Sequence, residues 1–108
     1  MSAGAARRYC GGMLGALALV LGSACVQAAD IIKGSQIYAM HCASCHGPSG
    51  ISVIPGVPNL ARAERMLQSD LALLASLKAG KNTMPAYMGI LTDQQILDVI
   101  AFSRTLRR

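Results

Sequence analysis

Apolar side chains recur with the period of an α-helix in three separate stretches of the chain. The first stretch covers residues 32–45 and stops at Gly47 and Pro48, a pair of residues that ends helices. The next sixteen letters, GPSGISVIPGVPNLAR, contain three prolines and three glycines, and are predicted to form a long structured loop. No alternation typical of strands follows anywhere, which predicts an all-α fold.

Two further helices are marked by their capping residues. Ser69 precedes the run LALLASLKAG, whose leucines repeat at helical spacing and whose Gly80 is placed to close the helix. Thr92, followed three residues later by Gln95, has the form of a capping box for the last helix. The apolar stripe of that helix consists of Ile96, Val99, Ile100, Phe102 and Leu106.

The N-terminal 28 residues have the pattern of a secretory signal rather than of a domain. Arg7 and Arg8 precede an apolar run that is short and interrupted by small residues, and Val26 and Ala28 stand at −3 and −1 of a small-residue cleavage site. We therefore expect residues 1–28 to be a cleaved signal peptide and residues 29–108 to be the mature domain, located in the periplasm.

Two alternatives for this segment stay open. The apolar run could be retained as a membrane anchor, or Cys25 could carry a lipid anchor, because LGSAC has small residues before its cysteine. The expected mature chain has no segment long and apolar enough to span a bilayer.

Composition narrows the class of the mature domain. The whole chain of 108 residues has a formal net charge of +5, but its basic residues are dispersed and have few aromatic neighbours, which argues against nucleic acid as a partner. About 80 residues is close to the size at which a protein core becomes marginal. With one Phe, three Tyr and no Trp, the chain would gain from a large apolar cofactor at its centre.

The stretch HCASCHGPSG contains the chemistry of such a cofactor. On a helix, Cys42 and Cys45 project from one face with His46 beside them, so that two thiols can add to the two vinyl groups of a haem while the imidazole reaches the iron. A zinc site would need four ligands, and only His41 remains nearby. A redox dithiol would normally follow a strand of a βαβ unit, which is not predicted here. The spacing therefore indicates one covalently attached haem c.

A second axial ligand is expected from a methionine, since a thioether commonly closes the other face of the iron in electron carriers. Met40 lies too close to the attachment site, and Met66 is more typical of a core or surface position. Met84 precedes Pro85 in a loop between two helices and is the predicted ligand. Met88 shares that loop and is the alternative.

These motifs resemble those of class I c-type cytochromes of the small bacterial monohaem kind, over residues 34–106. Gly34, Tyr38 and Cys42 follow the spacing of that family's first helix, in which the glycine permits a close crossing by the last helix and Phe102 matches the aromatic partner. PNLAR resembles the family's proline-x-leucine step, AGKNTMPAY its methionine loop and LTDQQILDVIAF its final helix.

The resemblance implies a small cytochrome c fold, with three to five short helices wrapped around one haem. It implies that the carbonyl of Pro58 holds the imidazole of His46, with Pro55 as a nearby alternative, and that an aromatic at Tyr87 packs near the ring or donates toward it. The expected apolar wall of the haem pocket consists of Leu60, Leu71, Leu74, Ile90, Leu91 and Ile100. The expected candidates for contacts with the haem propionates are Lys81, Asn82 and Arg62.

The function implied is that of a periplasmic one-electron carrier, not an enzyme, which shuttles electrons between redox proteins such as a periplasmic dehydrogenase and a terminal oxidase or reductase. The alternative is a haem c subunit of a larger periplasmic oxidoreductase complex. The chain is accordingly expected to be a monomer or a subunit of such a complex.

Overall fold

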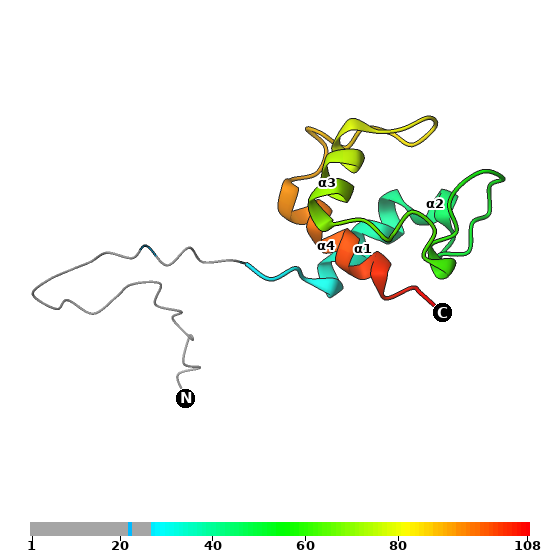
Figure 1. Ribbon diagram of the computed structural model, residues 1–108, viewed down its shortest axis with the longest axis horizontal. Helices are drawn as coiled ribbons and strands as arrows, with labels where there is room; N and C mark the ends of the chain where they lie inside the picture. Colours follow the sequence, from blue (N-terminus) through cyan, green and yellow to red (C-terminus); the bar gives the residue numbers. More distant parts are fainter. Residues whose placement is uncertain (1–21, 23–26) are drawn as a thin grey trace, which may run out of the picture.

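The computed structural model of the chain describes residue 22 and residues 27–108 (Figure 1). The predicted signal peptide lies outside the described residues apart from positions 22, 27 and 28, and so do Cys10 and Cys25. The described helices are α1 (Ile31–His41), α2 (Ala43–His46), α3 (Asp70–Ala79) and α4 (Asp93–Arg104), with one 3₁₀ turn, η1 (Leu60–Arg62). Residues 27–108 contain isolated bridges but no strand, which confirms the all-α class.

The predicted first helix is divided in two at Cys42. Asp30 caps α1 by accepting a hydrogen bond from the backbone of Lys33 (3.0 Å). At Cys42 the backbone turns to φ −118° and ψ −37°, and α2 continues as one further turn that ends at Gly47, where φ is +79°. The prediction of one continuous helix over residues 32–45 was therefore wrong at Cys42, where the helix is interrupted. Cys45 and His46 lie on the separate turn that follows the bend.

The other two helices begin where their caps predict. The side chain of Ser69 accepts a hydrogen bond from the backbone of Ala72 (3.1 Å) at the start of α3. Thr92 and Gln95 form the predicted capping box at the start of α4, each side chain accepting a hydrogen bond from the other residue's backbone (3.1 and 2.8 Å). Both caps satisfy donors that a helix start would otherwise leave unpaired.

Helices α1 and α4 cross at close range and form the base of the molecule (Figure 1). Gly34 lies at the crossing, where a Cβ atom would collide with the carbonyl of Asp98 and reach 3.0 Å from the Cβ of Phe102. One turn further along α1, the rings of Tyr38 and Phe102 pack with centroids 5.2 Å apart. The close approach that the sequence predicted at Gly34 is confirmed.

Arg104, at the end of α4, holds the segment that leads into α3. Its guanidinium donates to the carbonyls of Met66 (2.6 Å) and Gln68 (2.8 Å) and pairs with the carboxylate of Asp70 (2.8 Å). This fixes residues 66–69, which form no regular element, and the first residue of α3 against α4. None of the helices in the described ranges has the length and apolarity needed to cross a bilayer.

Candidate functional site

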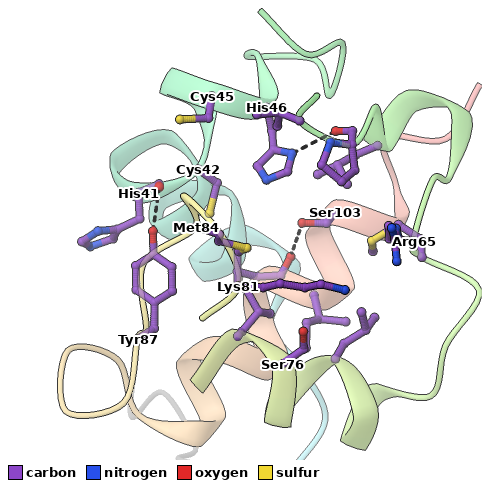
Figure 2. A pocket seen from close by; sticks show the side chains of 18 of the residues that line it. His41, Cys42, Cys45, His46, Arg65, Ser76, Lys81, Met84, Tyr87 and Ser103 are labelled. Atoms are coloured by element: carbon purple, nitrogen blue, oxygen red, sulfur yellow. Dashed lines mark hydrogen bonds between the residues drawn. The ribbon is translucent and has the colours of Figure 1, made fainter. Parts of the chain in front are cut away.

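A cavity of about 320 Å³ lies between the four helices and the two long loops (Figure 2). Its volume falls within the range of about 300–1,000 Å³ that is typical of small-molecule sites. The hydrophobic core consists of Ile37, Tyr38, Leu60, Met66, Leu73, Tyr87, Ile96, Val99 and Ile100. All of these except Ile37 and Ile96 also line the cavity. The core of the protein is thus arranged around a space rather than packed upon itself.

Two free thiols stand along one side of this cavity. Cys42 lies at the bend between α1 and α2 and is half-buried, whereas Cys45 on α2 is exposed. Burial, together with the neighbouring Cys45, raises the pKa of the Cys42 thiol to about 11. Before any attachment the Cys42 sulfur is therefore held as a thiol at neutral pH. Both sulfurs line the cavity, as the predicted attachment requires.

His46 points its ring into the same cavity from the end of α2 (Figure 2). Its Nδ1 lies 3.0 Å from the carbonyl oxygen of Pro58, so Nδ1 carries the proton and donates it to that oxygen. The lone pair of Nε2 is then left for a ligand. The hydrogen bond runs to Pro58, and no such bond is formed with Pro55, the alternative considered above.

Ser52 was not predicted and supports the same carbonyl. Its hydroxyl lies within hydrogen-bonding distance of the carbonyl oxygens of Val57 (2.7 Å) and Pro58 (2.9 Å), which fixes the loop at the point where His46 contacts it. A serine within a loop rich in glycine and proline gives no distinctive signal in the sequence. Its role depends on loop geometry that only the structure provides.

Met84 enters the cavity from the loop that follows α3 (Figure 2). The loop is a tight turn in which the backbones of Lys81 and Met84 hydrogen-bond to each other in both directions (3.1 and 2.9 Å). Met84 is half-buried and lines the cavity, while Met88 is 67% exposed and does not. Of the two methionines in this loop, the geometry favours Met84 as a ligand.

Two tyrosines close the cavity beside the thiols. The hydroxyl of Tyr38 donates to the carbonyl of Gly47 (2.6 Å), and that of Tyr87 donates to the carbonyl of His41 (3.0 Å). The Tyr87 ring also meets the ring of His41 edge to face, with centroids 5.8 Å apart. Tyr87 therefore joins the methionine loop to α1, and its hydroxyl is used by the backbone rather than directed toward a ring in the cavity.

The apolar wall differs in part from the one expected. Leu60 and Ile100 line the cavity as expected, but Leu71, Leu74, Ile90 and Leu91 do not. Leu71 is 74% exposed and Ile90 is 59% exposed. Helix α3 presents Leu73 and Leu77 to the cavity instead. The apolar residues of α3 lie on all sides of the helix, so their spacing in the sequence does not show which side faces the cavity.

Of the expected propionate contacts, Lys81 and Asn82 line the cavity and Arg62 does not. Arg65, which the sequence did not single out, lines it as well. Within the described ranges, no three side chains of His, Cys, Asp or Glu come together in a way that could hold a metal ion by themselves.

Comparison with known proteins identifies the family. Residues 29–102 match the family model described as "Cytochrome C oxidase, cbb3-type, subunit III". Cytochrome c6 of Thermosynechococcus vestitus is 36% identical over 77 residues, covering 69% of this chain and 69% of its own length. The chain belongs to the c-type cytochrome family. Cytochrome c6 of a Nostoc species is 38% identical over 85 residues, with 69% of each chain covered.

A solved structure agrees with this assignment. Cytochrome c6 from the diatom Phaeodactylum tricornutum superimposes with a TM-score of 0.60 at 30% identity, covering 70% of this chain and 92% of its own. The small cytochrome c fold predicted from the sequence is thereby confirmed. Membership of the family also establishes the cofactor, a covalently bound haem c with its iron, and the role of an electron carrier.

The residues around the cavity fit this cofactor. The cavity offers two thiols and an imidazole with a free Nε2 on one side, and a thioether enters from a different loop. Most of the remaining lining is apolar, and within the described part of the chain it includes no Asp or Glu. This combination suits a large apolar ring that carries a metal at its centre and carboxylates at its edge.

Proposed function

We propose that this cytochrome is a periplasmic one-electron carrier in which Cys42 and Cys45 form the thioether bonds and His46 and Met84 are the axial ligands of the iron. The observation that carries this proposal is that His46 and Met84 line one cavity from separate elements, while the Nδ1 of His46 is bonded to Pro58 and its Nε2 is left free. Bound haem supplies the Fe(III)/Fe(II) couple.

The protein's own groups set the behaviour of that couple. The Pro58 carbonyl fixes the orientation of the imidazole and makes it a stronger donor, as such partners do for metal-bound histidines. The turn between Lys81 and Met84 limits the movement of the thioether. With haem bound, His46 and Met84 would hold the iron from two separate elements in both oxidation states, and a methionine ligand raises the potential relative to two histidines.

The same arrangement supports a carrier rather than an enzyme. A haem enzyme or gas-binding protein needs an open sixth position with polar groups beside it, whereas here Met84 would occupy that position. Its polar neighbours in the turn are Lys81, Asn82 and Thr83, and none of them is an acid or a histidine. The reduced protein is therefore expected not to bind carbon monoxide.

The partners would be redox proteins of the periplasm, reached after export directed by residues 1–28. A dehydrogenase as donor and a terminal oxidase or reductase as acceptor fit the one-electron chemistry. Exposure of Cys45 supports contact through the thioether-bearing edge of the haem, since that edge would lie near the surface. The matching family model is described as an oxidase subunit, which keeps a tethered subunit as the alternative.

Replacement of Met84 tests the axial assignment. Met84→Ala should leave the haem covalently attached, abolish the methionine-to-iron charge-transfer band, lower the potential and admit exogenous ligands. Met88→Ala is the matched control, because Met88 lies in the same loop but outside the cavity. Unchanged spectra in Met84→Ala, or loss of the band in Met88→Ala, would contradict the assignment.

Gel filtration of the protein extracted from its native source distinguishes a free shuttle from a subunit. A free shuttle should elute at monomer size on gel filtration after gentle extraction. Elution together with a larger haem protein would instead support the subunit alternative.

A further inference from the structure

Among the residues that the structure describes, Arg65 and Lys81 are the only Arg or Lys side chains that line the cavity, and neither is paired there with an acid. The ion pairs of residues 27–108 are Lys78 with Asp93 and Arg104 with Asp70. Neither the guanidinium of Arg65 nor the ammonium of Lys81 donates a hydrogen bond within those residues. Two exposed cations therefore face a cavity whose described lining contains no carboxylate.

Both cations lie on the side of the cavity away from the thiols (Figure 2). The figure shows the ammonium of Lys81 extending toward the side where Arg65 lies, while the sulfurs of Cys42 and Cys45 lie on the other side. Haem carries its two vinyl groups on one edge and its two propionate carboxylates on the opposite edge. A ring attached at Cys42 and Cys45 would accordingly direct its propionates toward Arg65 and Lys81.

The backbone around Arg65 is fixed in an uncommon conformation. Its φ is +63°, in the left-handed region that residues other than glycine seldom adopt. On one side Glu64 is held by the backbone of Asn59 (2.7 Å), and on the other side Met66 is buried and bonded to Arg104. The carboxylate of Glu64 is thereby occupied outside the cavity, and Arg65 alone is directed into it.

Lys81 is connected to the proposed axial ligand. Its backbone exchanges two hydrogen bonds with that of Met84, so the two residues move as one turn. A carboxylate bound by Lys81 would hold this turn against the haem, and would stabilise the position of Met84 as well as neutralise charge.

We propose that Arg65 and Lys81 bind the haem propionates as a pair, and that this pair raises the potential of the iron; the proposal rests on attachment of the haem at Cys42 and Cys45. Arginine suits a carboxylate because it can donate two parallel hydrogen bonds. A cation near the iron, or a propionate whose charge is neutralised, disfavours the additional positive charge of Fe(III). Loss of either cation would therefore favour the oxidised state.

Other titratable groups face the cavity from the elements around it. His41 lies beside the thiols, and the phenols of Tyr38 and Tyr87 donate to backbone carbonyls. His46 is assigned to the iron. The propionates are thus the groups whose ionisation Arg65 and Lys81 would control, and their titration separates this role from a general surface charge.

The test measures the potential of the haem-loaded protein between pH 5 and 9 for Arg65→Gln, Lys81→Gln and the double variant. Arg62→Gln is the matched control, since it removes one positive charge from the same segment but outside the cavity. Each single variant should shift the balance toward the oxidised form by about threefold, which is about 28 mV for one electron. The step in the pH profile should move to higher pH, and Arg65→Lys should restore most of the potential.

The haem methyl resonances of the oxidised protein give a second measurement, because they report propionate ionisation directly. A double variant whose potential and titration match those of Arg62→Gln would overturn the proposal, and a response to only one single variant would overturn the pairing. Failure of attachment at the cysteines is recognised separately, because the wild-type protein would then lack covalent haem by mass.

Discussion

A methyl group added at Gly34 tests the crossing of α1 and α4 more directly than any other substitution. In Gly34→Ala the new Cβ would collide with the carbonyl of Asp98, which is backbone and cannot rotate away, and would also press on the Cβ of Phe102. The two helices would have to move apart. Since Tyr38 and Phe102 pack directly beyond this point, their contact would loosen as well.

Two opposing effects determine the size of the change. Alanine is favoured over glycine inside a helix by about 1 kcal/mol, which would stabilise α1 if nothing else changed. Overpacking of a well-packed site costs about 1–3 kcal/mol and more where the backbone must shift. Because the new Cβ collides with backbone, we expect overpacking at this site to cost about 3 kcal/mol. After the gain in helix propensity, the free energy of unfolding should fall by about 2 kcal/mol, roughly a thirtyfold change in the folding equilibrium.

The measurement is urea unfolding of the haem-loaded protein, followed by circular dichroism and by the haem absorbance. The propensity effect is calibrated with Gln36→Ala and Gln36→Gly, because Gln36 lies on α1 and is exposed. The free energy of unfolding of Gly34→Ala should fall although alanine is the better helix former. A variant as stable as the wild type, or more stable, would refute the close crossing.

Two further predictions concern groups that stabilise the fold. Burial raises the pKa of Tyr38 from 10.0 to about 12, so the stability that depends on its neutral phenol is complete below pH 10 and is lost as the pH rises toward 12. Tyr38→Phe should make the free energy of unfolding, measured by denaturant titration, less dependent on pH in this range. An unchanged slope would contradict the assignment. Arg104→Ala should lower the free energy of unfolding by about 2 kcal/mol, because it removes two hydrogen bonds to carbonyls as well as the ion pair with Asp70. Asp70→Asn should cost below about 1 kcal/mol, since an exposed ion pair contributes little, and equal losses in the two variants would show that the carbonyl contacts are unimportant.

Local signals allowed the sequence to predict a large part of this fold. The caps at Ser69 and Thr92 were found because each uses a side chain within three residues of the donor it satisfies. The attachment motif needs only five consecutive residues to be recognised, and Gly34 could be predicted because the resemblance placed it opposite the last helix. These features do not depend on how distant segments meet.

The features that the sequence did not predict depend on contacts between distant segments or on the conformation of loops. The bend at Cys42 comes from the φ and ψ angles of that one residue, and no glycine or proline stands there to indicate it in the sequence. Leu71 and Leu74 were predicted to form the side of α3 that faces the cavity. The sequence of a helix with apolar residues on all sides does not show which of them will be buried. The contact of Tyr87 with the carbonyl of His41 joins residues 46 positions apart. The directions of Ser52 and Arg65 follow from loop conformations with no periodic pattern.

Because seven of the nine residues of the hydrophobic core surround the cavity, we expect the packing of this core to depend on bound haem. A chain without haem would lack the group that joins the inner faces of its helices, and such loosely joined segments open readily. Proteases would remove chains that miss the attachment step, whereas finished molecules would survive. We therefore expect the amount of this carrier in the cell to depend on the supply of haem as well as on the supply of polypeptide.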